Sequence, residues 1–559
     1  MVISLFGVRL VQLQGLDPHA YAAAAAAEGL VEVTLPAKRG PILDRDGVPL
    51  ASSIDGLMVV ADPAQTADRA GEIARFLSTK LHIDYFDAKA ALSKTGTRFA
   101  YVARRVPSTL AMDVVAEAKA LGYKGIDTRS DPLREYPAHD VAANLIGFMG
   151  GVGQPLGGLE LTFNKMLAGT DGSEKYEVGA GNRLPLGDST TVAPQNGQDL
   201  HTTIDRDVQW YVQRVLRQTV LGARGDSGSA VVMDSRTGEL IAVADYPTFD
   251  ADNPLVSPKE DLGSRALSDV YEPGSVEKVL TLSSLIDAGK VTPHTKIVVP
   301  GAYPVLDTSI KDWFPHDRLH LTLTGVLAKS SNIGTVRAAE QFTPRQLHDY
   351  LASFGLGTRT GIGVRGESAG LLPAAGIWSI LSRATIAFGQ GVSVNAVQMA
   401  AAINTVANGG VYVSPSLIQG SATTDTGQVV GTDVTSTHRV ISTAAARAMS
   451  MMMERVLDPE EGVAPGAAIP GYRVAGKTGT AQRVDPKCGC YRGFTVSFAG
   501  FAPADDPRFT VYVVVQNPRD GKGGGSTAGP AFQKIMSHLL RRYGIEPTGT
   551  EPSHLPVEW

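Results

Sequence analysis

The chain has 559 residues, 43% of them hydrophobic, and a formal net charge of −5 from 51 basic and 56 acidic residues. This length is enough for several domains and for more than one buried core. The near-neutral charge argues against a nucleic-acid binder that works by neutralising phosphates. No run of about 20 apolar residues occurs, which excludes a polytopic membrane protein, and the recurring apolar runs exclude a disordered chain.

The first 14 residues form an apolar segment that is too short to cross a bilayer. Residues 1–8 are apolar, and Arg9 separates them from a second short run. The segment lacks the basic start and the small-residue cleavage site of a signal peptide. A short surface helix would fit it, but we interpret residues 1–14 as the C-terminal stump of a membrane-anchor helix.

The following 180 residues or so predict mixed helices and strands, an α+β organisation. An Asp46-Gly47 pair between two β-prone runs predicts a hairpin. A turn-rich segment at 192–197 predicts the main domain boundary. Helices are expected over 17–30, 67–77, 88–92, 109–121 and 159–167, and strands over 31–35 and 99–103.

Beyond this boundary the pattern changes to that of a sheet flanked by helices. A helix is expected over 205–221, then a strand hairpin, several helices down to about Asn408, three more strands and a closing helix. The strands are expected over 229–233, 240–244, 472–476, 495–500 and 510–515, and the closing helix over 527–543.

Cys488 and Cys490 are the only cysteines. Their close spacing is poor for a mutual disulfide, and two thiols are too few for a zinc site. We therefore expect an irregular loop that carries two thiols. The histidines show no HExxH-type spacing, so no metal is expected.

Three short motifs carry the chemistry. Ser275 and Lys278 lie three residues apart in a stretch that predicts a helix, so both lie on one face. A serine hydroxyl needs a base beside it to act as a nucleophile, and a lysine whose pKa is lowered by burial can be that base. Ser330-Ser331-Asn332 and Lys477-Thr-Gly-Thr480 follow in this order, and Gly479 leaves room for a ligand along its strand.

SxxK, SxN and KTG in this order resemble the penicillin-recognising serine transpeptidases and β-lactamases. Further segments are similar to class B high-molecular-weight penicillin-binding proteins over about residues 9–545. Three of them resemble the boxes of the pedestal domain and three belong to the catalytic part: Arg39–Gly47, Arg134–Pro137, Gly157–Glu160, Tyr271–Ser275, Gly389–Gly391 and Asn408–Gly410.

The resemblance implies an α+β multidomain fold in four parts. These are the anchor stump (1–14), an elongated pedestal or dimerisation domain (15–195), a transpeptidase domain (196–546) and a C-terminal tail (547–559). The transpeptidase domain would have an antiparallel sheet flanked by helices and an all-helical subdomain.

The resemblance also implies the role of each site residue, with no cofactor. Ser275 would attack the D-Ala–D-Ala carbonyl, Lys278 would take its proton, and Ser330 would relay protons to the leaving D-Ala. Asn332 would hold the substrate amide or the lysine. The remaining residues would bind the substrate carboxylate or form the oxyanion hole, together with the Ser275 N–H: Lys477, Thr478, Gly479 and Thr480.

The implied function is peptidoglycan D,D-transpeptidation by a membrane-anchored enzyme outside the cytoplasm. Implied partners are stem peptides as donor and amine acceptor, β-lactams, a polytopic glycan polymerase and divisome proteins, and no nucleic acid. A short pedestal favours the septal, cell-division type, and Arg-over-Lys bias with abundant Ala indicates an actinobacterial-like source. The alternatives are an elongation-type transpeptidase, a D,D-carboxypeptidase, a β-lactamase, a β-lactam sensor or a scaffold with a dead site.

Three positions depart from the family pattern: Ala138, Asn395 and Glu277. Only Glu277 lies inside a catalytic motif, where the family usually has a bulky apolar residue. We expect its carboxylate to point away from the catalytic face and to affect the packing or the local field of the helix.

Overall fold

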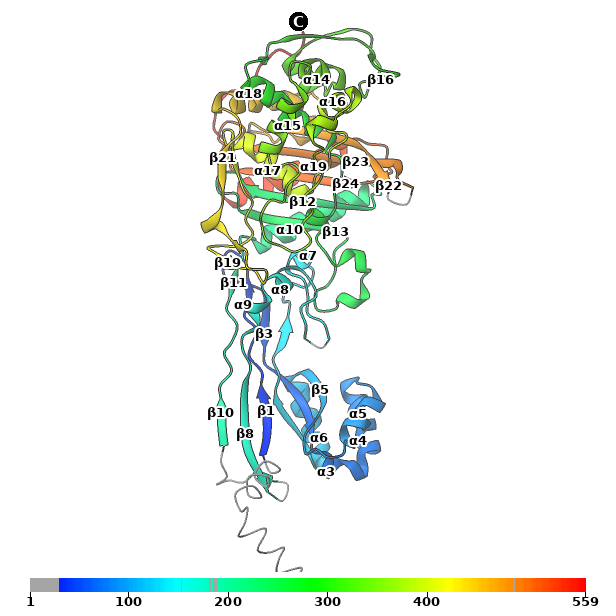
Figure 1. The fold of residues 1–559 in the computed structure, drawn as a ribbon, viewed down its shortest axis with the longest axis vertical. Coiled ribbons are helices and arrows are strands. Elements are labelled where there is room, and N and C mark those ends of the chain that lie inside the picture. The colour runs from blue at the N-terminus through cyan, green and yellow to red at the C-terminus, as the bar shows by residue number, and fades with distance from the viewer. Residues whose placement is uncertain (1–29, 152, 180–181, 184–188, 486–487) are drawn as a thin grey trace, which may run out of the picture. The chain divides into compact units, whose positions relative to one another are not determined.

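The computed structural model describes residues 30–559, apart from 152, 180–181, 184–188 and 486–487 (Figure 1). The predicted anchor stump (1–14) lies outside the described residues, and so do residues 17–29 of the helix expected over 17–30. Within them, no helix is both long enough and apolar enough to cross a membrane. The chain divides into two compact units, of which the larger contains Ile42–Leu50, Tyr136–Asn164 and Leu200–Trp559.

The smaller unit contains a three-stranded antiparallel sheet packed against helices. The sheet has the order β5-β4-β6 (Ala100–Pro107, Gly56–Ala61 and Ile126–Ser130). The helices bury one apolar face each, and Ile73, Leu77 and Val114 join Val59 in the shared core. Their bounds agree with the prediction to within a few residues: α4 Ala70–Leu81, α5 Tyr85–Leu92 and α6 Ser108–Ala120.

The smaller unit also contains a second sheet. β8 (Gly172–Gly179) pairs antiparallel with β1 (Leu30–Leu35) on one side and with β10 (Ser189–Val192) on the other. β1 confirms the strand expected over 31–35.

Several short elements lie outside the sheets and helices described so far or join them. They are α3 Pro63–Thr66, α7 Ala143–Ile146, α8 Gly158–Thr162, α9 Asn164–Ala168, α11 Arg265–Ser268, β7 Leu133–Glu135, β9 Asn182–Arg183 and β11 Leu200–His201.

The hairpin predicted at Asp46-Gly47 is present between β2 (Ile42–Leu43) and β3 (Pro49–Ile54). Gly47 has a φ of 80°, the left-handed conformation that such turns favour. Asp44 closes the turn by accepting hydrogen bonds from the N–H groups of Asp46 and Val48, at 2.9 and 2.8 Å.

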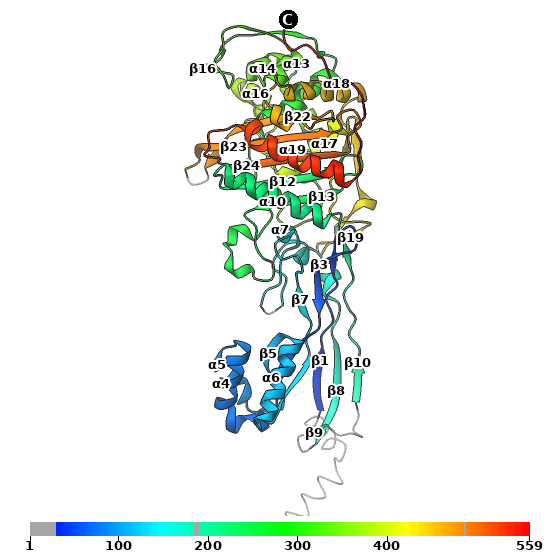
Figure 2. The same ribbon diagram turned by 180° about the vertical axis from the view of Figure 1, so that it is seen from behind.

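A five-stranded antiparallel sheet is the centre of the larger unit. Its order is β13-β12-β24-β23-β22, so β22 is an edge strand. Helices α10 and α19 lie on one face (Figure 2) and α17 lies on the other (Figure 1), which is why β12 is buried along its whole length. The bounds are β12 Ser227–Asp234, β13 Leu240–Tyr246, β22 Ala475–Asp485, β23 Cys490–Ala502, β24 Phe509–Gln516, α10 Arg206–Gly222, α17 Ala396–Ala407 and α19 Gly524–Arg542.

Helices are the main regular elements of the segment between β13 and β22. In addition to α11 and α17, they are α12 Lys278–Asp287, α13 Leu323–Ala328, α14 Asn332–Ala339, α15 Pro344–Ser353, α16 Ile380–Ile386 and α18 Thr443–Glu454. The segment is not all-helical, because short extended runs pair into two-stranded sheets. These strands are β14 Lys296–Val299 with β17 Leu319–Thr322, β15 Tyr303–Val305 with β16 Thr308–Ile310, β18 Val411–Val413 with β21 Thr437–Arg439, and β19 Ala422–Thr423 with β20 Val429–Val430.

Asp205 joins α10 to the end of α19. It caps α10 by accepting from the N–H groups of Asp207 and Val208. Arg542 donates two hydrogen bonds to its carboxylate, at 2.8 and 3.0 Å, and Tyr543 donates a third. Burial alone would raise the pKa of Asp205, but the hydrogen bonds from Arg542 and Val208 lower it below its ordinary value.

We predict that Asp205→Ala lowers the free energy of unfolding by about 3 kcal/mol, because both the helix cap and the charged hydrogen bonds are lost. Asp205→Asn keeps the cap and should lose about half as much. Since the folded-state pKa is depressed, the stabilisation is present above about pH 4 and is lost as the pH falls further. Denaturant titrations at neutral and acidic pH measure this, and equal stability of Asp205→Ala and wild type at neutral pH would contradict it.

Candidate active site

Two close backbone contacts position Ser275. It lies in a 3-10 turn, Gly274–Val276, that leads directly into α12. Gly274 has a φ of 55°, and a Cβ there would lie 2.8 Å from the Thr480 carbonyl oxygen. On its other side, Gly274 donates a 3.0 Å hydrogen bond to the Gly389 carbonyl, and a Cβ on Gly389 would lie 2.1 Å from the Gly274 carbonyl oxygen. The nucleophile loop is therefore held between β22 and the 389–391 loop.

The edge strand β22 carries the KTG motif close to this loop. A Cβ on Gly479 would lie 2.2 Å from Ser497 Oγ and 2.9 Å from Val276, so only glycine allows this packing. Lys477 and Thr478 are buried, whereas Thr480 is exposed. Thr480 and Ser275 both line one cavity of about 630 Å³, which Asn332, Phe388 and Gln390 also line.

The three motifs meet at Ser330. Lys278 Nζ donates to the Ser330 carbonyl and to Asn332 Oδ1, both at 2.7 Å, and Ser330 Oγ lies 3.5 Å away. Lys477 Nζ donates to Ser330 Oγ at 2.8 Å and to the Thr478 carbonyl at 3.1 Å. The structure thus brings the three predicted motifs together.

Ser330 is held in an unusual backbone conformation at the end of the turn between α13 and α14. Its φ is 57°, which is uncommon for a residue other than glycine and typical of functional sites. Among the described residues, Lys278 Nζ makes no hydrogen bond to Ser275. In catalytic sites the hydrogen bond between the base and the nucleophile is often long in the free enzyme, and it shortens when substrate binds.

Burial governs the charge state of the two lysines. Both side chains are completely buried. Desolvation lowers the pKa of Lys278 to about 7, although the charges of Asp312 and Glu277 act in the opposite direction. Desolvation, and then the charge of Lys278, hold the pKa of Lys477 well below its ordinary value. At neutral pH a neutral lysine is therefore accessible beside Ser330.

Glu277 lies where the sequence places it, inside the SxxK motif. Its side chain is completely buried, and its Oε1 accepts a 2.6 Å hydrogen bond from Thr281, one turn along α12. Burial raises the pKa of Glu277 well above its usual range, although the hydrogen bond from Thr281 and the charge of Lys278 act in the opposite direction.

Two carboxylates at the site were given no role from the sequence. Asp312 binds the start of α14, where the SxN motif lies. Glu272 Oε1 accepts hydrogen bonds from Gly391 N–H, at 2.9 Å, and from Tyr491 Oη, at 3.0 Å. A helix that begins in a buried site needs a partner for its first N–H groups, but the sequence does not show which acidic residue supplies it.

The expectation of two thiols at Cys488 and Cys490 is wrong, because the two residues form a disulfide. Gly489 between them has a φ of 62°, and this turn leaves the two Cα atoms 5.2 Å apart. That distance lies within the range that a disulfide spans. The bridge lies next to β23, which begins at Cys490.

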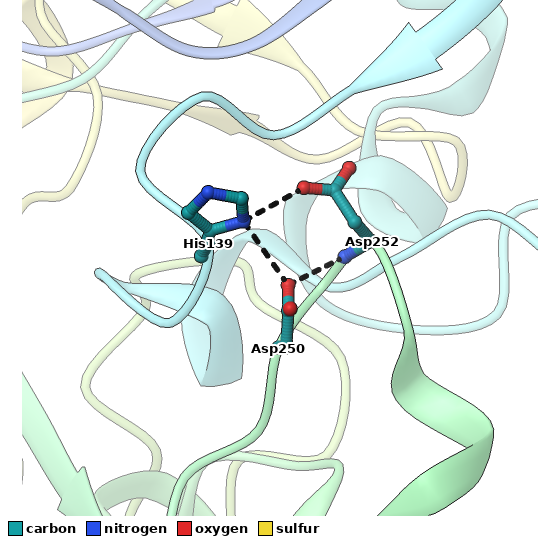
Figure 3. A group of neighbouring side chains, drawn as sticks. All are labelled: His139, Asp250 and Asp252. Carbon is teal, nitrogen blue, oxygen red and sulfur yellow. Dashed lines mark hydrogen bonds and ion pairs between the residues drawn. The ribbon is translucent and has the colours of Figure 1, made fainter.

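One group of side chains in the larger unit has metal-ligand types close together: His139, Asp250 and Asp252 (Figure 3). His139 Nδ1 lies 3.2 Å from Asp252 Oδ2 and 3.6 Å from Asp250 Oδ1. All three side chains are partly exposed, and Asp252 accepts a hydrogen bond from the Tyr136 N–H. Exposed acidic groups of this kind are common without a metal ion.

Comparisons with known proteins agree with this geometry. The penicillin binding protein transpeptidase domain matches residues 228–537, and the penicillin-binding protein dimerisation domain matches residues 34–202. The chain is 35% identical over 589 residues to penicillin-binding protein PbpB of Mycolicibacterium smegmatis, covering 99% of this chain and 90% of the relative. It is also 35% identical over 547 residues to peptidoglycan D,D-transpeptidase FtsI of Escherichia coli, covering 96% and 89%.

Solved structures give the same result. The crystal structure of penicillin binding protein 3 from Mycobacterium tuberculosis, complexed with aztreonam, has a TM-score of 0.72 and 30% identity, covering 94% of this chain and 100% of that one. A peptidoglycan synthetase from Bifidobacterium adolescentis has a TM-score of 0.75 and 29% identity, covering 95% and 100%. The chain belongs to the penicillin-binding proteins, in their class B, septal type, and is a serine-type peptidoglycan D,D-transpeptidase.

The close contact at Gly389 generates a prediction. Gly389→Ala should slow acylation by a fluorescent penicillin roughly 100-fold, because the added methyl displaces the loop that carries Ser275. Gly427→Ala is the matched control: its φ of 87° is close to the 86° of Gly389, but no atom lies within 4 Å of the added Cβ. Equal acylation rates for the two variants would contradict this account of loop positioning.

Proposed function

We propose that Ser275 is the nucleophile of the transpeptidation. Its oxygen would bond to the carbonyl carbon of the penultimate D-Ala, the peptide bond to the terminal D-Ala would break, and D-Ala would leave as the amine. An amine of a neighbouring stem peptide would then attack the acyl-enzyme, form the crosslink and release the serine. The observation that carries the proposal is the pair of buried lysines converging on Ser330 beside the Ser275 cavity.

Lys278 is the general base in this proposal. A base works best when its pKa lies near the working pH, and burial lowers the pKa of Lys278 to about 7. Its position three residues after Ser275 puts it on the same face of the helical turn. Asn332 supports this role because its Oδ1 accepts from Lys278 Nζ, which fixes the direction of the amine.

Ser330 completes the path of the proton to the leaving amine. Its hydroxyl lies 2.8 Å from Lys477 Nζ and 3.5 Å from Lys278 Nζ, so it can pass a proton between the two sides of the site. Lys477, Thr478 and Thr480 supply a positive charge and hydroxyl groups for the substrate carboxylate. The N–H groups of Ser275 and Thr480 form the oxyanion hole, supported by the close packing of Gly274 on Thr480.

β-Lactams are proposed to acylate the same hydroxyl. Structures of the M. tuberculosis relative are described as complexed with aztreonam and with ampicillin. A β-lactam amide opened by Ser275 leaves its amine attached to the acyl group, so no leaving group departs and the acceptor's access stays blocked.

We also propose that the chain works in septal wall synthesis, outside the cytoplasm and attached to the membrane. Its partners would be a polytopic glycan polymerase and divisome proteins. The disulfide of Cys488 and Cys490 supports the location, because disulfides persist in oxidising compartments. The domain boundaries 15–195, 196–546 and 547–559 are part of this proposal.

We predict that Ser275→Ala abolishes covalent labelling by a fluorescent penicillin, because no other residue takes the place of its hydroxyl. Ser284→Ala is the control: this buried hydroxyl donates to the Leu280 carbonyl within α12 and should be dispensable for labelling. Gel fluorescence of the two purified variants measures the label. Label that persists in Ser275→Ala would exclude the assignment of the nucleophile.

A second prediction concerns pH. Lys278 is a base only when neutral, so the acylation rate constant should rise with pH and reach half its maximum near the Lys278 pKa of about 7. Lys278→Arg stays charged at all accessible pH values and should lose at least about 100-fold in rate. Stopped-flow acylation of both proteins over a pH series tests this, and a flat profile for the wild type would contradict it.

A further inference from the structure

Asp312 is a buried carboxylate that the mechanism above does not use. It lies in the loop between β16 and β17, and its side chain is completely inaccessible to solvent. Its Oδ1 accepts from the N–H groups of Asn332 and Ile333, at 2.6 and 3.0 Å. Its Oδ2 accepts from Ser331 Oγ at 2.7 Å and lies 3.1 Å from His316 Nε2.

These contacts hold the SxN motif in place. The first N–H groups of α14 have no partner within the helix, and a carboxylate at this end also interacts favourably with the helix dipole. Asn332 is held at three points: its N–H by Asp312, its Nδ2 by the Lys311 carbonyl at 3.0 Å, and its Oδ1 by Lys278 Nζ at 2.7 Å. A single residue, Asn332, therefore connects Asp312 to the amine of Lys278.

His316 lies on the far side of Asp312. Its side chain is only 5% exposed, and its Nδ1 lies 2.9 Å from the Asp317 carbonyl oxygen. A carbonyl and a carboxylate can only accept hydrogen bonds, so this arrangement places a proton on each ring nitrogen. The imidazolium then balances the charge of Asp312 inside the protein.

We propose that Asp312 and His316 form a positioning pair for acylation, in which Asp312 fixes Asn332 and through it Lys278, while His316 holds Asp312 and balances its charge. This proposal rests on the role of Lys278 proposed above. Neither residue contacts the cavity that contains Ser275, so both act through Asn332.

The pair also acts on Lys278 through its charges. Three titratable side chains act on or face Lys278 from three elements: Asp312 from its loop, Glu277 from the start of α12 and Lys477 from β22. The charge of Asp312 raises the pKa of Lys278 against the effect of burial. Removing the negative charge should lower this pKa, and removing the balancing imidazolium should raise it.

The two substitutions therefore predict opposite shifts. Asp312→Asn keeps the shape and an oxygen for the N–H groups of α14, but it removes the charge. The rising limb of the acylation profile should move to lower pH by about one unit, and the plateau should fall about 10-fold or more. His316→Gln keeps a donor to Asp312 and removes the positive charge, so the limb should move to higher pH.

The experiment measures acylation of the full chain by a fluorescent penicillin over a pH series, with thermal unfolding of each variant alongside. Asp317→Asn, in the same loop, and His320→Gln, in β17, are matched controls, because both residues are exposed. The rising limbs of their acylation profiles should coincide with that of the wild type. If Asp312→Asn does not fold, the direction of the His316→Gln shift relative to His320→Gln decides the question.

Opposite shifts in folded variants support the proposal. Shifts in the same direction, or a His316→Gln limb that coincides with the wild type, overturn it. A wild-type profile without a rising limb near neutral pH would instead overturn the role of Lys278, which distinguishes failure of the proposed function from failure of the positioning pair.

Discussion

The burial of two lysine side chains around one serine is the constraint on which the site depends. Moving an ammonium group out of water costs several kcal/mol, and a second like charge nearby adds to that cost. The protein meets it with hydrogen bonds from both lysines to Ser330 and with a lowered pKa for each lysine. A lysine side chain, which is charged in water at neutral pH, thereby becomes a base that can work near neutral pH.

The rest of the larger unit holds these side chains in place. The central sheet is covered on both faces, which leaves the edge strand β22 to present the KTG motif. Glycines at 274, 389 and 479 let three backbone segments approach more closely than a Cβ would allow. Asp312 then fixes the start of α14, so that the SxN motif meets Lys278 at hydrogen-bond distance. Asn332, which accepts from Lys278, is itself held by the Asp312 carboxylate and the Lys311 carbonyl.

The sequence predicted the parts of this account that depend on local patterns. Apolar runs located four of the five central strands, whereas β22 covers Ala475–Asp485 and overlaps the strand expected over 472–476 by only two residues. The three motifs identified the residues that meet at Ser330. Asp312 escaped prediction because its contacts join a loop to a helix 20 residues further along the chain, with no spacing rule to connect them. The disulfide escaped because it depends on the left-handed turn at Gly489, which the spacing of the two cysteines does not reveal.

Direct titration of the Lys278 amine tests the central claim most sharply. In protein labelled with ¹⁵N at the lysine Nζ atoms, the Lys278 signal is the one that disappears in Lys278→Arg. The account predicts that this signal titrates with a midpoint of about 7, because the ammonium form is desolvated beside Ser330 and Asn332. A midpoint near the ordinary lysine value of about 10.4 would show that burial does not create the base, and would contradict the account.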